Sequence, residues 1–286
     1  MSKLAIIGGS GIYKLDNINL IKWIDVKTKW GNPSDKIALL SYEGKEFYFL
    51  PRHGRNHSIS PSNINYRANI EALKRMKVEN VISISAVGSL KEDHPPGKFV
   101  LVDQFIDQTY KRNKSFFEND IIAHVSMASP TNKQLRINAK KRLDSLNIPN
   151  QNGGVYVAIE GPQFSSKAES KVFRSFDADV IGMTNMPEAK LVKEAEMRYM
   201  SVSMVTDYDC WHPDHETVSV EQIIKNLKNN SLNAEKFIQK FILNYEESLD
   251  NEDDDLNSLK HSIITPRDNW GKETIDNLEF IISKYL

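Results

Sequence analysis

Two carboxylates follow an apolar run late in the chain, in Thr206-Asp207-Tyr208-Asp209-Cys210-Trp211. Residues two apart on an extended chain point to the same side, so Asp207 and Asp209 share a face if strand geometry continues past Val205. Such a pair can accept hydrogen bonds from an exocyclic amine, while one member whose pKa is raised by burial delivers a proton. The alternative is a turn with two solvated aspartates.

Three small-residue turns, each after a strand-like run, could together hold an anion. Gly8-Gly9-Ser10-Gly11 is not a dinucleotide fingerprint, because Lys14 stands where the third glycine belongs, yet its N–H groups and the Ser10 hydroxyl can face an anion. Arg52-His53-Gly54-Arg55 offers donors suited to phosphate, and Ser85-Ala86-Val87-Gly88-Ser89 is the third turn. Ligands bind beyond strand ends in α/β sheets, so the turns could converge. Taken singly, each turn could equally be an ordinary turn or polar loop.

Two strand-to-helix connections could contact the rest of a flat ligand. Gly161-Pro162-Gln163-Phe164 carries an aromatic ring that could stack on a ligand or pack in the core. In Met183-Thr184-Asn185-Met186-Pro187, the Thr184 hydroxyl and the free N–H groups of the following helix suit an anion or a sugar hydroxyl.

Two other patterns are weaker. Cys210 with His212 has no recognised nucleophile–base spacing, and His212-Pro213-Asp214-His215 lacks a third well-spaced metal ligand. We expect both to be loop residues, and we expect no metal site.

Taken together, these segments resemble the purine nucleoside phosphorylase family, in its 5′-methylthioadenosine phosphorylase branch. The matches occur in family order from residue 4 to about residue 230, which is far more specific than any single motif. The matching stretches are residues 6–11, 51–55, 61–69, 87–90, 159–166, 182–184 and 206–211.

The resemblance implies a single α/β domain whose mixed, twisted sheet forms a distorted barrel flanked by helices, assembled as a trimer. It assigns phosphate binding to Ser10, Arg52, His53, Ser85, Ala86 and Thr184. Ser10 replaces a commoner threonine and keeps the hydroxyl. The resemblance places Met183 against the ribose, Phe164 near the base, and Asp207 and Asp209 on adenine. It assigns the pocket for the 5′ group to Val220, Ile223, Ile224 and, from a neighbouring subunit, His124.

The implied reaction is phosphorolysis of S-methyl-5′-thioadenosine to adenine and 5-methylthioribose 1-phosphate, with phosphate as co-substrate and no metal or organic cofactor. Cleavage develops positive charge on the ribose, which phosphate beneath the anomeric carbon stabilises. A protonated Asp207 would protonate N7 of the purine, and Asp209 would accept from the 6-amino group. Two aspartates favour adenine, because a 6-oxo group needs a donor. Methylthioinosine or other purine nucleosides remain alternative substrates, and a non-catalytic nucleoside-binding protein is the alternative class.

Strand-like and helix-like runs alternate along the chain, which by itself indicates one α/β domain. We expect strands over 4–7, 36–42, 46–50, 80–85, 99–106, 154–159, 179–183 and 200–205. We expect helices over 63–77, 131–146, 166–176, 187–199 and 276–285, with a long helix capped by Ser219 and Gln222. Capping boxes are predicted for Thr131 with Gln134 and for Ser166 with Glu169.

The composition of the chain limits the partners and the cellular location that we expect. The 286 residues carry 37 Lys and Arg against 38 Asp and Glu, so the formal charge of −1 gives no reason to expect nucleic acid as a partner, and the 111–114 cluster is expected to be solvated surface. A single cysteine, Cys210, excludes an internal disulfide, and no apolar run approaches the roughly 18 residues of a membrane helix. We therefore expect a cytoplasmic protein without a membrane partner. Residues 246–286 follow the family poorly and contain a solvated acidic linker, 251–255.

Overall fold

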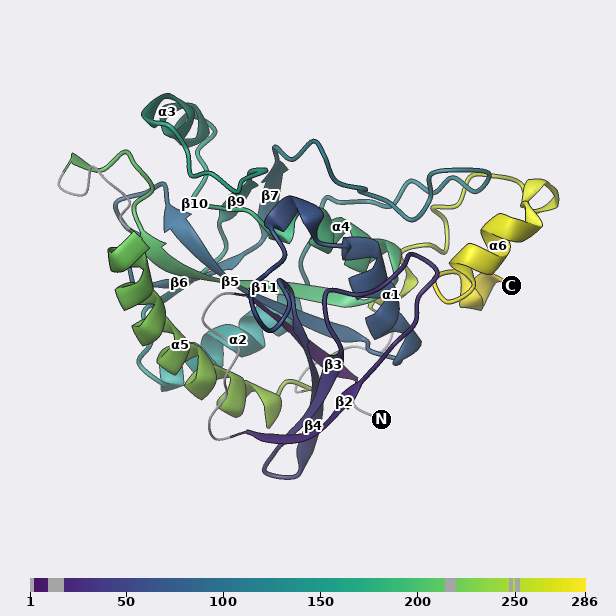
Figure 1. The fold of residues 1–286 in the computed structure, drawn as a ribbon, viewed down its shortest axis with the longest axis horizontal. Helices are drawn as coiled ribbons and strands as arrows, with labels where there is room; N and C mark the ends of the chain where they lie inside the picture. The colour runs from purple at the N-terminus through teal and green to yellow at the C-terminus, as the bar shows by residue number, and fades with distance from the viewer. Residues whose placement is uncertain (1–2, 10–17, 214–219, 247–248, 250–252) are drawn as a thin grey trace.

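A twisted mixed sheet forms the centre of the molecule, and helices cover its two faces (Figure 1). The computed structural model describes the chain apart from residues 1–2, 10–17, 214–219, 247–248 and 250–252, and it leaves out the side chains of residues 220–223. In the part of the chain so described, no helix is long and apolar enough to cross a membrane.

The described residues form eleven strands and six α-helices. The strands are β1 (Leu4–Gly8), β2 (Asn19–Ile24), β3 (Ile37–Tyr42), β4 (Lys45–Pro51), β5 (Asn80–Ser89), β6 (Phe99–Val102), β7 (Gln104–Asp107), β8 (Asn150–Asn152), β9 (Val155–Ala158), β10 (Val180–Gly182) and β11 (Arg198–Asp207). The helices are α1 (Tyr66–Arg75), α2 (Lys133–Ser145), α3 (Lys167–Ser175), α4 (Asn185–Glu194), α5 (Val220–Ile242) and α6 (Lys272–Leu278).

The central strands are buried on both faces, which explains why their sequences are continuous apolar runs rather than alternating ones. In β1, Leu4 and Ile6 pack in the cluster that includes α2 and α5, whereas Ala5 and Ile7 pack in the cluster that includes α1 and α4. Figure 1 shows these two helix pairs on opposite sides of the sheet.

The sheet closes into a ring because two long strands that pair with each other are kinked, one formed by β6 and β7 and the other by β8 and β9. β5 pairs with β11 on one side and, at its C-terminal end, with β10 on the other, and the ring continues from β10 through β9 to β7 and from β11 through β6 to β8. β6 runs into β7 at Asp103, and β8 runs into β9 at Gly153 and Gly154, whose φ angles are +102° and +145°. The Asp103 carboxylate accepts from the N–H of Gly154 at 3.0 Å. The predicted α/β fold with a distorted barrel is thus confirmed.

Most predicted elements are present, with shifted ends. The strand predicted over 99–106 is split at Asp103, and β2 and β8 were not predicted. The helix predicted over 187–199 already ends at Glu194, because Glu196 adopts a φ of +52° and β11 begins at Arg198. The capping box of Ser166 and Glu169 is present, but α2 is capped by Asn132 and not by Thr131. Ser219 lies outside the described residues.

The C-terminal segment packs against the body of the protein. Two of the three described residues of the acidic linker are not solvated as predicted, because Asp253 pairs with Arg198 at 3.0 Å and Asp255 pairs with Lys193, whereas Asp254 is exposed. The predicted terminal helix over 276–285 is instead α6, followed by a short 3₁₀ turn at Ser283–Tyr285.

Candidate active site

A cavity of about 730 Å³ opens where β1, β4, β5, β10 and β11 end. Its lining brings together ten of the side chains predicted for the site: Arg52, His53, Ser85, Ala86, Phe164, Met183, Thr184, Asp207, Asp209 and Ile224. Ser10 lies outside the described residues, as do the side chains of Val220 and Ile223. His124 is exposed and does not line this cavity.

Arg52 follows β4 and is fully buried, and most of its guanidinium faces away from the cavity. Its Nε donates to Glu188 at 2.8 Å, and its Nη2 donates to Glu188 at 3.2 Å and to the Ser83 hydroxyl at 2.6 Å. Its Nη1 donates to the carbonyl of Ile84 at 3.2 Å and lies beside Gly9, where an added Cβ would come within 2.9 Å. The donor fork that was expected to hold phosphate is therefore used on Glu188, and only the Nη1 edge is placed to reach an anion.

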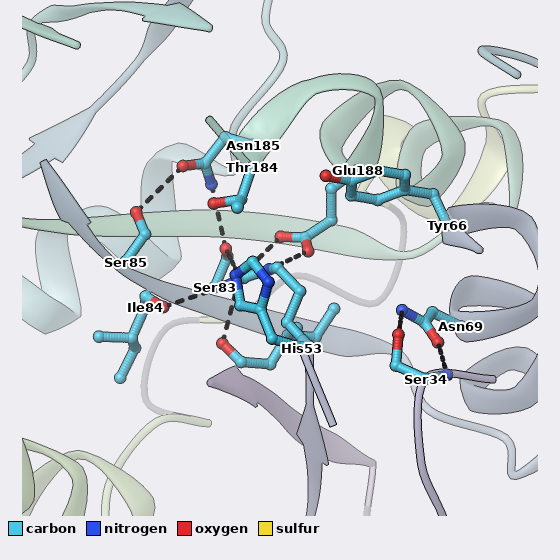
Figure 2. A network of polar contacts seen from close by, with 12 residues as sticks. Ser34, His53, Tyr66, Asn69, Ser83, Ile84, Ser85, Thr184, Asn185 and Glu188 are labelled. Carbon is cyan, nitrogen blue, oxygen red and sulfur yellow. Dashed lines mark hydrogen bonds and ion pairs between the residues drawn. The ribbon is translucent and has the colours of Figure 1, made fainter. Parts of the chain in front are cut away.

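A buried polar network connects this ion pair to the turn before α4 (Figure 2). The amide of Asn185 donates to the hydroxyls of Ser83 and Tyr199, at 3.0 and 2.6 Å, and its oxygen accepts from Ser85 at 3.2 Å. Tyr199 in turn donates to Glu188 at 2.9 Å. Because the charges of Arg52 and Glu188 offset each other, this wall presents dipoles and hydroxyls rather than net positive charge.

His53 is held as a neutral imidazole. Burial, together with the adjacent Arg52 charge, lowers the pKa of His53 to about 4. Its Nδ1 lies 2.8 Å from the carbonyl of Ile59, which can only accept, so Nδ1 carries the proton. Nε2 is then the unprotonated nitrogen, an acceptor for a protonated phosphate oxygen.

The connections after β9 and β10 form the next wall. Thr184 is the N-cap residue of α4 but does not cap it with its side chain, so the hydroxyl on the cavity is not used by the helix. Phe164 also lines the cavity, with 53% of its surface exposed, which excludes the core packing that the sequence left open.

Asp207 is the last residue of β11 and is half-buried at the cavity wall. Burial raises the pKa of Asp207 to about 6 against the opposing hydrogen bonds, and the nearby charge of Asp209 adds to the rise. Thr206 donates to Oδ2 at 2.7 Å, and the N–H of Asp209 donates to Oδ1 at 2.8 Å. A carboxyl group with a pKa this close to neutrality can hold and release a proton under physiological conditions.

Asp209 reaches the same cavity by a different backbone path from the one predicted. The strand ends at Asp207, and Asp209 has a φ of +51°, so the two side chains are brought together by a tight turn rather than by strand alternation. Asp209 is 5% exposed, and burial raises its pKa against the opposing hydrogen bonds of Ser170 and Ser165. Because Asp209 also lines the cavity, its carboxylate can accept a hydrogen bond from a ligand N–H.

α5 closes one side of the cavity with Ile224 and Leu227. Asn226 and Asn230 anchor the helix to β11 by donating to the carbonyls of Thr206 and Val205, at 2.7 and 2.8 Å. The apolar wall and the strand that carries Asp207 are therefore fixed to each other.

Arg112 was missed by the sequence analysis, which placed residues 111–114 on the solvated surface. The structure corrects this for Arg112: it is buried and pairs with Glu160, with an Nε to Oε1 distance of 3.2 Å. No local pattern indicates the burial, because the partners of Arg112 come from segments far away in the sequence.

Cys210 and His212 are not paired with each other, as the sequence analysis expected. Cys210 donates to the carbonyl of Ser165, and His212 lies 3.1 Å from Glu92.

Comparison with known proteins agrees with this geometry. The sequence model of the phosphorylase superfamily matches residues 3–243. An S-methyl-5′-thioadenosine phosphorylase from Rhodospirillum rubrum is 52% identical over 82% of this chain and 80% of its own, and one from Koribacter versatilis is 44% identical over 99% and 97%. The second alignment includes the C-terminal segment.

Solved structures of methylthioadenosine phosphorylases are also similar to this chain. A methylthioadenosine phosphorylase from an antarctic soil metagenomic library has a TM-score of 0.90 and 41% identity, and the match covers 98% of both chains. A variant of the adenosine/methylthioadenosine phosphorylase from Schistosoma mansoni, in complex with methylthioadenosine, has a TM-score of 0.82 and 28% identity, covering 99% of this chain and 98% of its own. With the family match spanning most of the chain, this protein belongs to the phosphorylase superfamily.

Proposed function

We propose that this protein catalyses the reversible phosphorolysis of S-methyl-5′-thioadenosine to adenine and 5-methylthioribose 1-phosphate. The observation that carries the proposal is the pair of aspartates on one cavity wall, of which Asp207 has a pKa of about 6 and Asp209 is buried. A relative that is named for this activity and whose match covers 99% of the chain supports it.

In this proposal, phosphate binds where the turns after β1, β4 and β10 meet the C-terminal half of β5. The donors are hydroxyls and backbone N–H groups around Ser85, Ala86 and Thr184, with the Nη1 edge of Arg52 and the neutral His53. A phosphate fixed beneath the anomeric carbon stabilises the positive charge that develops on the ribose as the glycosidic bond breaks. The phosphate then attacks the anomeric carbon. Fixed positioning of this kind contributes roughly 7–11 kcal/mol to lowering a barrier.

The leaving purine needs a proton at N7 and an acceptor at its amino group. Asp207, protonated, supplies the proton, and Asp209 accepts from the 6-amino group. The acceptor Asp209 favours a 6-amino purine, because a 6-oxo group would leave a buried carboxylate facing another acceptor. Phe164 covers the base and Met183 the ribose. The 5′ methylthio group lies against the apolar wall of Ile224 in α5, with Val220 and Ile223 on the same helix.

The proposed reaction requires no metal and no organic cofactor, since phosphate is the nucleophile. We further propose a homotrimer in the cytoplasm that acts on small molecules, not on nucleic acid or a membrane. In this assembly His124, which is exposed and outside the cavity of its own chain, would contribute to the 5′ pocket of a neighbouring copy.

A comparison of substrates tests the proposal. Methylthioadenosine, methylthioinosine and adenosine are supplied in turn with phosphate, and release of the free base is followed by chromatography. We expect adenine from methylthioadenosine, with methylthioinosine much poorer. Preference for methylthioinosine would keep the reaction and overturn the argument from Asp209. Binding without turnover of any of the three would leave a nucleoside-binding protein.

A further inference from the structure

The Arg112–Glu160 ion pair lies behind the cavity rather than in it, and neither residue lines the cavity. Both side chains are buried, with 1% and 6% of their surfaces exposed. Burying a charge pair is costly unless its remaining donors and acceptors are also satisfied. Where those donors and acceptors are directed therefore shows what the pair holds in place.

The guanidinium of Arg112 joins two neighbouring connections of the cavity wall, those that follow the paired strands β9 and β10. Its Nη1 donates to the carbonyls of Met183 and Met186, at 2.7 and 2.5 Å, where β10 is followed by the first residues of α4. Its Nη2 donates to the carbonyls of Ile159 and Glu160, at 3.3 and 2.9 Å, at the start of the connection that carries Phe164. One planar group thus fixes the spacing between these two backbone segments.

The carboxylate of Glu160 extends the contact to two more segments. It accepts from the Ser62 hydroxyl, in the loop whose Ser60 and Pro61 line the cavity. Its other oxygen accepts from the N–H groups of Tyr110 and Lys111, at 2.7 and 3.2 Å. Burial alone would raise the pKa of Glu160, but these hydrogen bonds and the Arg112 charge lower the pKa to about 2, so the pair is ionised.

We infer that Arg112 and Glu160 are positioning residues that hold the wall near Phe164 in register with the wall near Met183 and Thr184. The inference rests on the proposed function, in which these walls contact the base, the ribose and phosphate. A misplacement of about 1 Å in such a site costs on the order of 100-fold in rate. A lysine cannot replace the function fully, because a single ammonium cannot span two pairs of carbonyls in a fixed fork.

Kinetics of Arg112→Lys and Arg112→Met test the consequence for the reaction. We expect kcat/KM for methylthioadenosine to fall about 10-fold in Arg112→Lys and about 100-fold in Arg112→Met, chiefly through KM, with the lysine charge rescuing part of the loss. Arg198 is the matched control, because it is a buried arginine paired with Asp253 and does not line the cavity. Arg198→Met should lower Tm and leave KM within twofold of the unsubstituted protein. Equal KM in all variants would overturn the inference.

Hydrogen exchange by mass spectrometry tests the positioning without any substrate. Arg112→Met, and independently Glu160→Gln, should speed exchange at least tenfold in residues 110–111, 159–164 and 183–186, but not in β5. Unchanged exchange in those segments, or the same acceleration in Arg198→Met, would contradict the inference. If the unsubstituted protein releases no adenine, the proposed function fails, and exchange still decides whether the pair holds these segments together.

Discussion

Replacing Asp207 by asparagine should reduce activity and increase stability, because the property that suits Asp207 to donate a proton is also a cost to the fold. Asparagine keeps the shape and the hydrogen bonds: Oδ1 still accepts from the N–H of Asp209, and the new amide can donate to Thr206. The hydroxyl of Thr206 can then turn to the carbonyl of Val87, 3.1 Å away. The substituted site is therefore expected to fold without rearrangement.

The size of the stability effect follows from the pKa. Burial raises the pKa of Asp207 from 3.8 to about 6. At about 1.4 kcal/mol for each unit, the ionised carboxylate destabilises the folded protein by up to about 3 kcal/mol. A raised pKa means that the folded state binds the proton more tightly, so this penalty is absent below about pH 4, develops between pH 4 and 6, and is complete above pH 6. Asparagine removes the penalty, and its benefit should follow the same pH course.

Whereas Asp207→Asn should raise the stability, it should lower the activity. Loss of a general acid typically costs 10²- to 10⁴-fold in rate, and we expect the fall in kcat for Asp207→Asn to lie in that range. Denaturant unfolding at pH 5 and pH 7.5, together with steady-state release of adenine, measures both effects. Near-normal kcat would refute the acid role, and an unchanged free energy of unfolding at pH 7.5 would refute the assignment of the pKa to burial.

Three further substitutions or titrations test other parts of the site. Asp209→Asn supplies a donor to position 6 of the purine and should move the ratio of kcat/KM values at least tenfold toward methylthioinosine; an unchanged ratio would mean that Asp209 does not contact that position. Glu188→Gln leaves the Arg52 charge buried and uncompensated, so we expect a loss of about 3–5 kcal/mol in the free energy of unfolding and a raised KM for phosphate, with the stability loss absent if the pair does not matter. Binding of phosphate should raise the pKa of His53 from about 4, because the anion favours the imidazolium, and the imidazole signal in an NMR titration with and without phosphate would show no difference if His53 does not face the anion.

Local sequence predicted the central part of the strands well, because runs such as 80–85 and 200–205 are apolar, but residues 85–89, which were expected to form a turn, are the last residues of β5. It predicted the N-cap of α2 poorly, because Thr131 and Asn132 are both good capping residues and only the packed structure distinguishes them. There, Asn132 caps the helix and also donates to Asp253 and Asp255. The same long-range contacts explain why the acidic linker was wrongly expected to be solvated.

The candidate site could be assembled from sequence because its side chains follow strand ends in short motifs that resemble a known family. Motifs identify the side chains but not their partners. Arg52 was expected to direct its donor fork at the anion, whereas its fork is held by Glu188, far away in the chain. Arg112 was not identified because its burial depends on carbonyls of two distant segments. Such charge pairs become visible only when the fold is known.

The most direct test of the account is whether cleavage of methylthioadenosine requires phosphate and transfers the sugar to it. The protein is incubated with methylthioadenosine with and without phosphate, and phosphorus NMR follows the sugar product while chromatography follows adenine. Phosphorolysis predicts that adenine and a pentose 1-phosphate form in equal amounts when phosphate is present, and that neither forms without it. Adenine release without phosphate, or with free methylthioribose as the product, would contradict phosphorolysis and indicate hydrolysis.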